Sequence, residues 1–247
     1  MKKPALIGIL GFFSIWGAIT LFKLYDVFFL PSPIDVLIDL FTMLTNGSLN
    51  LDIYYTVLRL GAAFLLAAII GIPLGLLLGS ATKIYDSMEF LVEFLRSIPP
   101  IAIFPLFMLI FGIEDTSKIA VAAFGATLII IFNTAHGVLN SKKSRIIAAK
   151  LMGATKSQIF KKILFWESLP QTFIGLRTGL SIALIIVIVT EMFIGTQFGL
   201  GRRIIDFQYI YNVKGLFAII ILTGIIGYAI NMVFSAAEKK IIHWKDK

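Results

Sequence analysis

Six long apolar stretches constrain what this 247-residue chain can fold into more than any other feature of its sequence. They cover residues 5–22, 58–78, 88–113, 119–138, 172–194 and 216–236. A helix needs about 20 mainly apolar residues to cross the hydrocarbon core of a bilayer. Only 15% of the residues are charged, against about a quarter in soluble domains, so lipid must cover much of the apolar surface. The sequence therefore predicts an all-α, polytopic membrane protein of about six transmembrane helices, with residues 1–247 forming a single domain.

The N-terminal stretch has the look of a secretory signal, because Met1-Lys2-Lys3 precedes an apolar run. The run is long for a signal peptide, and no small-residue cleavage site follows it. We therefore expect residues 5–22 to remain as the first helix. After it, Pro31-Ser32-Pro33 begins an amphipathic pattern, which predicts a short helix lying on the membrane surface.

The basic residues predict the orientation of the chain. With the N-terminus inside, the inner segments hold about fourteen of the 22 Lys and Arg residues, seven of them in residues 142–162. The outer segments hold Lys23, Arg59, Lys118, Arg202, Arg203 and Lys214. Because cytoplasmic loops of membrane proteins collect Lys and Arg, we expect both termini on the cytoplasmic side of a bacterial plasma (inner) membrane. The same rule accounts for the net charge of +8, so no nucleic-acid partner is expected.

Small residues recur every four positions along two of the predicted helices. The second helix carries Ala63, Ala67, Gly71, Gly75 and Gly79, and the fifth carries Gly175, Gly179 and Ala183. This spacing lets helix backbones approach closely in lipid. It indicates either tight packing within the subunit or a groove that faces the substrate or a second subunit.

The third stretch is interrupted by prolines at Pro99, Pro100 and Pro105. Proline removes a backbone donor, so the helix should kink or break there. A break at membrane depth is tolerated where the backbone is buried in protein or faces water. Pro99 and Pro100 are therefore candidate pathway or gate residues. Glu93 and Arg96 precede them and share one helix face, as an ion pair would require.

Glu191 is the most informative single charge, because it lies within the fifth apolar stretch. A carboxylate in a membrane helix costs about 3 kcal/mol and usually faces the bundle interior or a watery path. Three roles stay open: a carboxylate hydrogen-bonded to a neighbouring helix, a part of the pathway or gate, and a proton relay. An anionic substrate would be repelled by it, so we interpret Glu191 as a gate or a structural anchor. Gly179 completes the candidate pathway residues.

Residues 139–170 form the longest segment on the predicted cytoplasmic side, and their pattern predicts two short helices around Gly153. Glycine is typical of a helix C-terminus. Thr155-Lys156-Ser157-Gln158 fits a capping box that begins the second helix. A helical hairpin that projects into the cytoplasm suits docking of a partner protein, whereas the alternative is a solvated loop.

Several kinds of chemistry are excluded by what the sequence lacks. It has no cysteine and no phosphate-binding G-x-x-x-x-G-K-[ST] motif, so ATP hydrolysis would need another chain. Neither His136 nor His243 lies in a ligand-spaced cluster, so we expect no metal and no cofactor. The clustered polar residues of a membrane-embedded enzyme are also missing.

The hairpin resembles that of the membrane subunits of binding-protein-dependent ATP-binding-cassette importers. Their motif reads Glu-Ala-Ala, three residues, Gly, nine residues, then Ile-x-Leu-Pro. This chain has Ile147-Ala148-Ala149, Gly153 and Ile163 at that spacing, with Ile147 in place of Glu and Trp166 in place of Pro.

Motifs along the rest of the chain are similar to one branch of that family, the permeases for nitrate, aliphatic sulfonates, taurine and related small molecules. The matching segments are Leu30-Pro31-Ser32-Pro33, Arg96-Ser97-Ile98-Pro99-Pro100, Phe111-Gly112-Ile113, Ser117-Lys118-Ile119, Asn133-Thr134, His136-Gly137, Leu176-Arg177, Glu191-Met192 and Gly199-Leu200-Gly201.

The resemblance implies a type I importer permease of six helices, which forms the pore with a second permease subunit, here as a homodimer. It implies two ATPase subunits that bind the ATP, and an extracytoplasmic substrate-binding protein. The hairpin would be the coupling helix seated on the ATPase, through Ala148, Ala149, Gly153, Ala154 and Thr155. The substrate would be a small polar or anionic molecule such as a sulfonate, taurine, nitrate or a vitamin precursor.

The main alternative from the residues is a self-contained secondary transporter. Such folds often contain internal repeats and charged residues at the membrane midplane. No clear repeat relates the two halves of this chain, and Glu191 is the one firm charge that we expect at mid-membrane.

Overall fold

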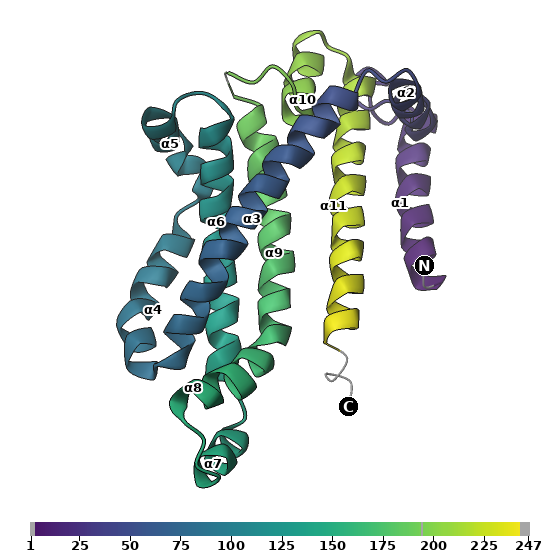
Figure 1. The fold of residues 1–247 in the computed structure, drawn as a ribbon. Helices are drawn as coiled ribbons and strands as arrows, with labels where there is room; N and C mark the ends of the chain where they lie inside the picture. The colour runs from purple at the N-terminus through teal and green to yellow at the C-terminus, as the bar shows by residue number, and fades with distance from the viewer. Residues whose placement is uncertain (1–2, 194, 243–247) are drawn as a thin grey trace.

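The computed structural model describes residues 3–193 and 195–242, and these form helices joined by short connections (Figure 1). The long helices are α1 (Lys3–Leu21), α3 (Asn50–Ser80), α6 (Asp115–Leu139), α9 (Phe165–Glu191) and α11 (Val213–Ile241). The shorter elements are α2 (Pro33–Thr45), α4 (Thr82–Ser97), η1 (Pro100–Ile103), α5 (Phe104–Phe111), α7 (Lys143–Leu151), α8 (Lys156–Ile159), η2 (Phe160–Leu164) and α10 (Leu200–Tyr209). Of the residues discussed above, Met1, Lys2 and His243 lie outside the described part, as does position 194.

The helices correspond in order to the six predicted apolar stretches. In the described residues, four helices are long and apolar enough to cross a membrane: Asn50–Ser80, Asp115–Leu139, Lys156–Glu191 and Val213–Ile241. The bent pair Ile84–Ser97 and Pro100–Phe111 gives a fifth crossing. The remaining stretch is α1. Its apolar part, Ile7–Leu21, is shorter than a full span. The all-α, polytopic architecture is thus confirmed.

Helix α6 lies at the centre of the subunit, and the small residues of α3 and α9 pack against it. A Cβ on Gly75 would lie 2.6 Å from the Thr134 Cβ, and a Cβ on Gly175 would lie 2.7 Å from the Asn133 Cβ. Gly179 faces α6 in the same way, because its Cβ would lie 3.3 Å from the Ala126 carbonyl oxygen. Both stripes therefore produce tight packing within the subunit, one of the two interpretations that the spacing allowed.

The predicted break in the third stretch is present and sharp. The axes of the two segments, Ile84–Ser97 and Pro100–Phe111, differ by 82°, and the break lies near mid-height in the bundle (Figure 1). Ile98 and Pro99 have extended backbones, as expected for residues that each precede a proline. The expected pairing of Glu93 with Arg96 is wrong, because the Arg96 guanidinium lies over the ring of Phe132, 3.9 Å from its centroid.

Helix α9 begins earlier than predicted. The proposed boundary at residue 170 falls inside the helix, which starts at Phe165 and contains Pro170. Proline already has a helical φ, so it removes one hydrogen bond without ending the helix, and neighbouring groups in a bundle can make up the loss. The hairpin is thereby joined to α9 without a loop.

Two short helices cover the end of the bundle opposite to α7 (Figure 1). Helix α2 begins at its N-cap Ser32, whose hydroxyl accepts a hydrogen bond from the Asp35 N–H. Val36 and Leu40 of α2 are buried, whereas Leu37 and Phe41 are exposed. Helix α10 lies in the same layer, packed against α11 and α9, and was not predicted.

Candidate functional site

The hairpin of α7, α8 and η2, residues 143–164, projects beyond the bundle (Figure 1). Helix α7 ends at Leu151, and Gly153 lies two residues beyond it with a φ of +79°. The Gly153 N–H donates to the Lys150 carbonyl at 3.0 Å, and the Ala154 N–H donates to the Ala149 carbonyl at 2.9 Å. These two bonds form a Schellman motif, which requires the left-handed conformation that glycine adopts most easily.

The second half of the hairpin begins with the predicted capping box. The Gln158 N–H donates to the Thr155 Oγ1 at 3.3 Å, and the Thr155 N–H donates to the Gln158 Oε1 at 2.8 Å. Helix α8 then passes through the π-helical turn η2 into α9. Single π-turns of this kind are frequent at functional sites.

Large apolar side chains are exposed at the tip of the hairpin. Leu151 is 84% exposed, Met152 is 87% exposed and Ile147 is 57% exposed. The predicted coupling residues Ala148, Ala149, Gly153, Ala154 and Thr155 lie around the same turn. Leu151 and Met152 were missing from that prediction, although two apolar residues directly before a C-terminal glycine could have pointed to them.

Glu167 connects the base of the hairpin to α9. Its carboxylate accepts a hydrogen bond from the Lys142 backbone N–H at 2.6 Å. It also pairs with Arg145 of α7, whose Nη1 lies 2.7 Å from Oε1. Side-chain contacts therefore connect the first hairpin helix to α9, in addition to the chain itself.

A buried polar cluster occupies the opposite end of the bundle, centred on Glu191. Glu191 is the last residue of α9 and is fully buried. Its carboxylate accepts from the Thr56 hydroxyl at 2.9 Å, from the Gly201 N–H at 3.0 Å and from Arg59 Nη1 at 2.6 Å. Every contact comes from α3 or from the start of α10, so Glu191 joins three helices.

Arg59 was expected in an outer segment, but it lies inside α3 and is 3% exposed. Its guanidinium also pairs with Asp115, with Nη2 and Oδ1 2.9 Å apart, and donates to the Phe198 carbonyl at 2.7 Å. Lys118, another residue expected outside, is fully buried in α6 with its Nζ 3.6 Å from Asp115. The positive charges at this end are thus matched by carboxylates.

The candidate pathway residues do not form one cluster. Pro100 and Gly179 both lie against the middle of α6, where the Pro100 ring approaches Gly125. Glu191 lies twelve residues beyond Gly179 on α9, about 18 Å along the helix axis. Any pathway that includes all of them extends over much of the membrane.

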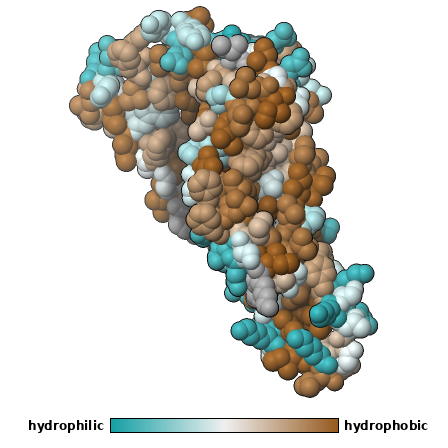
Figure 2. All heavy atoms as spheres, turned by 90° about the vertical axis from the view of Figure 1, so that its left-hand side faces the viewer, coloured by the Kyte–Doolittle hydropathy of each residue, from teal (hydrophilic) through white to brown (hydrophobic). Residues whose placement is uncertain are grey.

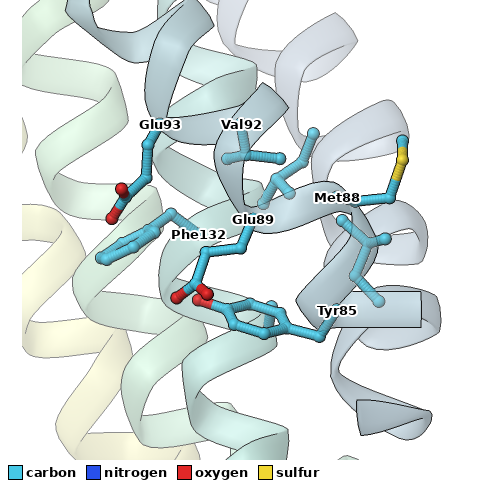
Figure 3. A pocket seen from close by; sticks show the side chains of 9 residues that line it. Tyr85, Met88, Glu89, Val92, Glu93 and Phe132 are labelled. Carbon is cyan, nitrogen blue, oxygen red and sulfur yellow. The ribbon is translucent and has the colours of Figure 1, made fainter. Parts of the chain in front are cut away.

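A second polar group lines the other half of the bundle, between α4 and α6. The Tyr85 hydroxyl and His136 Nε2 share a hydrogen bond of 3.2 Å. Figure 3 shows the Glu89 carboxylate beside the Tyr85 hydroxyl, and Glu93 beside Phe132. Groups of three or more metal-ligating side chains are absent from the described residues, so this group offers no metal site.

Comparison with known proteins identifies the family. Residues 71–243 match the family described as "Binding-protein-dependent transport system inner membrane component". The chain belongs to this family. It is the transmembrane permease of an importer whose ATPase activity resides in a separate subunit, and which works with a substrate-binding protein. The alternative of a self-contained secondary transporter is thereby removed.

Individual relatives cover most of the permease. A probable ABC transporter permease protein of Brucella abortus is 33% identical over 218 residues, which are 88% of this chain and 87% of that one. The putative aliphatic sulfonates transport permease protein of Bacillus subtilis is 26% identical over 233 residues, which are 94% of this chain and 84% of that one. The resemblance inferred from the short motifs is confirmed.

The fold has a match among solved structures. The inward-facing MetNI methionine ABC transporter contains a chain that superposes with a TM-score of 0.70 at 24% identity, over 78% of this permease and 95% of that chain. This confirms the importer permease fold. It also agrees with the multi-pass inner-membrane location of the family.

Proposed function

We propose that the hairpin, residues 143–164, seats on the separate ATPase subunit and transmits its movement to the bundle. The observation that carries this proposal is the exposed tip, where Leu151 and Met152 are 84% and 87% exposed on an element that is otherwise polar and basic. Exposed apolar side chains rimmed by polar ones mark protein interaction sites. The side chains stand on the capped turn at Gly153, which fixes their direction.

The proposal places the hairpin on the cytoplasmic side, where ATP is available. Residues 142–162 carry seven Lys and Arg residues, as the positive-inside rule requires. Helix α1 begins and α11 ends toward the same end of the bundle as the hairpin (Figure 1). Lys239 and Lys240 in the last turn of α11 add positive charge there. Both termini are then cytoplasmic.

The mechanism is alternating access driven by the ATPases. Closure of two ATPase subunits moves the hairpins, and the motion passes through η2 and the Glu167 contacts into α9. Helices α9 and α4, with the break at Pro99 and Pro100, swing between outward and inward openings. Two copies of this permease form the path between them. Apolar side chains cover much of the face that carries α4 and α5, with hydrophilic ones gathered toward the ends (Figure 2).

The substrate is a small polar or anionic molecule, delivered at the outer face by the binding protein. Support comes from the relative named for aliphatic sulfonate transport, which shares 26% identity across nearly the whole permease.

Docking is tested by co-purification with the ATPase. Leu151→Glu and Met152→Glu place a charge on the tip and should release the ATPase from the detergent-solubilised complex. Ile210→Glu is the matched control, because Ile210 is 69% exposed at the other end of the bundle. Full retention of the ATPase by both tip variants would overturn the proposal.

A further inference from the structure

Arg96 is a cation without a partner in the middle of the subunit. It lies in the last turn of α4, directly before the break at Ile98 and Pro99. Within the part of the chain that the structure describes, no carboxylate lies within 4.0 Å of its guanidinium, and no hydrogen bond holds it. Its recorded contact is the face of the Phe132 ring.

Three cations of the long helices α3, α6 and α9 have carboxylates beside them. Arg59 and Lys118 are buried beside carboxylates, and Arg177 lies 3.9 Å from Glu238. A lone charge near the centre of a bilayer costs about 2.5–3.5 kcal/mol and normally faces a watery cavity or a partner. The structure provides no partner for Arg96 among the described residues, so the ligand has to come from outside them.

A cavity lies next to Arg96, between η1, α6 and α9. Its volume is about 220 Å³, and Arg96 is the one charged residue among the eight that line it. Pro100, Gly125 and Ile182 form part of the apolar remainder. Gly125 allows α6 to pack closely beside the cavity, because a Cβ there would lie 2.7 Å from the Ile186 Cδ1 and 3.0 Å from the Pro100 ring. Pockets for drug-sized ligands measure roughly 300–1,000 Å³, so this one suits a small ion or molecule.

We infer that Arg96 binds the anionic group of the substrate at the mid-membrane break, through the oxygens of a sulfonate, nitrate or carboxylate. The inference deepens the proposed function and rests on it. The guanidinium is planar and weakly hydrated, and its paired N–H groups match two oxygens of one anion. The Phe132 ring holds the guanidinium by a cation–π contact until the anion arrives.

The position also explains why an arginine stands beside a proline break. The break separates α4 from α5 near mid-height in the bundle (Figure 1). The Arg96 side chain therefore lies next to the broken backbone, at the depth where an ion is furthest from bulk water. Glu191, which would repel an anion, is satisfied by its own partners at the outer end. The substrate therefore meets a free positive charge after passing a neutralised negative one.

The test is uptake by proteoliposomes that contain the complete importer, with its ATPases and binding protein. Radiolabelled taurine, methanesulfonate and nitrate serve as probes. Arg96→Gln should lower the kcat/KM of uptake about tenfold or more, the loss expected for a charge-assisted hydrogen bond. Arg96→Lys keeps the charge without the planar fork, and should restore part of the uptake. Arg177→Gln is the matched control and should stay close to the wild type.

Two further measurements separate substrate binding from other roles of Arg96. Arg96→Gln should retain the ATPase activity that the binding protein stimulates, and it should retain the melting temperature of the complex. Loss of both would assign Arg96 to folding and overturn the inference. The defect should also be equal in phosphatidylcholine liposomes and in liposomes that contain phosphatidylglycerol. A defect confined to the anionic lipid would mean that Arg96 binds a lipid phosphate instead.

The failure of the inference is distinct from the failure of the proposed function. If the wild-type importer moves these anions and Arg96→Gln moves them equally well, the inference alone is wrong. If the wild type moves none of them with ATP, the proposed substrate class fails and the inference fails with it.

Discussion

The Nη1 atom of Arg59 lies 2.6 Å from Oε1 of Glu191, although the two residues are 132 positions apart in the chain. The pair joins the half of α3 that lies away from the hairpin to the end of α9, and both side chains are almost completely buried. Gly199 makes the approach possible, because a Cβ there would lie 2.6 Å from the Glu191 carboxyl carbon. The end of the permease opposite the hairpin is therefore held by a compact ionic cluster.

Loss of one member of this pair should destabilise the permease strongly. Glu191→Ala leaves Arg59 buried beside one remaining carboxylate, and removal of one partner of a buried ion pair costs about 3–5 kcal/mol. The melting temperature of the purified protein in detergent measures the loss. The Arg59→Met/Glu191→Met double substitution should lose less than the sum of the two single ones.

The matched control for that experiment is Asp206→Ala. Asp206 pairs with Arg202 at 2.9 Å on the partly exposed surface of α10, where ion pairs contribute about 0–1 kcal/mol. Equal melting temperatures for Glu191→Ala and Asp206→Ala would show that the cluster does not hold this end of the bundle.

The contact between α3 and α6 predicts an asymmetry between two glycines of one helix. Gly75→Ala places a Cβ 2.6 Å from Thr134 and 2.8 Å from the Ile131 carbonyl oxygen, so it should cost about 1–3 kcal/mol by overpacking. Gly61→Ala meets no atom within 4 Å and should be neutral or slightly stabilising. Thermal unfolding in detergent compares them, and the reverse order would refute the packing.

Glu167→Ala should loosen the hairpin from α9. The substitution removes the acceptor of both the Lys142 N–H and the Arg145 side chain. Hydrogen exchange of residues 143–164 should become faster, while exchange in α6 stays unchanged. Arg145→Ala removes only one of the two contacts and should produce the smaller effect. Unaltered exchange in Glu167→Ala would contradict the link between hairpin and bundle.

The sequence alone was sufficient for the parts of the fold that depend on near neighbours. Gly153 and the Thr155–Gln158 box are local signals. The first helix of the hairpin ends and the second begins where those signals lie. Pro99 and Pro100 predicted the break, because a missing backbone donor acts within one turn. The apolar stretches gave the order of the long helices, since their length is set by the bilayer.

Long-range pairing is what the sequence could not provide. Helix α3 begins eight residues before the apolar stretch, at Asn50, and includes Asp52 and Arg59, which look like loop residues when taken alone. They are helical and buried because Arg203 pairs with Asp52 at 2.7 Å and Glu191 pairs with Arg59. A local sequence pattern cannot indicate partners that lie more than a hundred residues away in the chain.

Uptake and ATP hydrolysis measured together for Gly153→Trp test the coupling role of the hairpin most directly. No heavy atom of the subunit would lie within 4 Å of a Cβ at Gly153, although the left-handed backbone there strains any side chain. A control with the same strain therefore isolates the effect of a bulky side chain on the docked partner. Gly112→Trp is the matched control, with a φ of +82° against +79° and equally open space, at the other end of the bundle.

In proteoliposomes with the ATPases and the binding protein, Gly153→Trp should lower ATP-driven uptake by about ten- to a hundredfold, as for a misfit of 1–3 kcal/mol. ATP hydrolysis should continue, so that the ratio of ATP hydrolysed to substrate imported rises, while Gly112→Trp keeps the wild-type ratio. Uptake by Gly153→Trp at the wild-type rate and ratio would contradict the account.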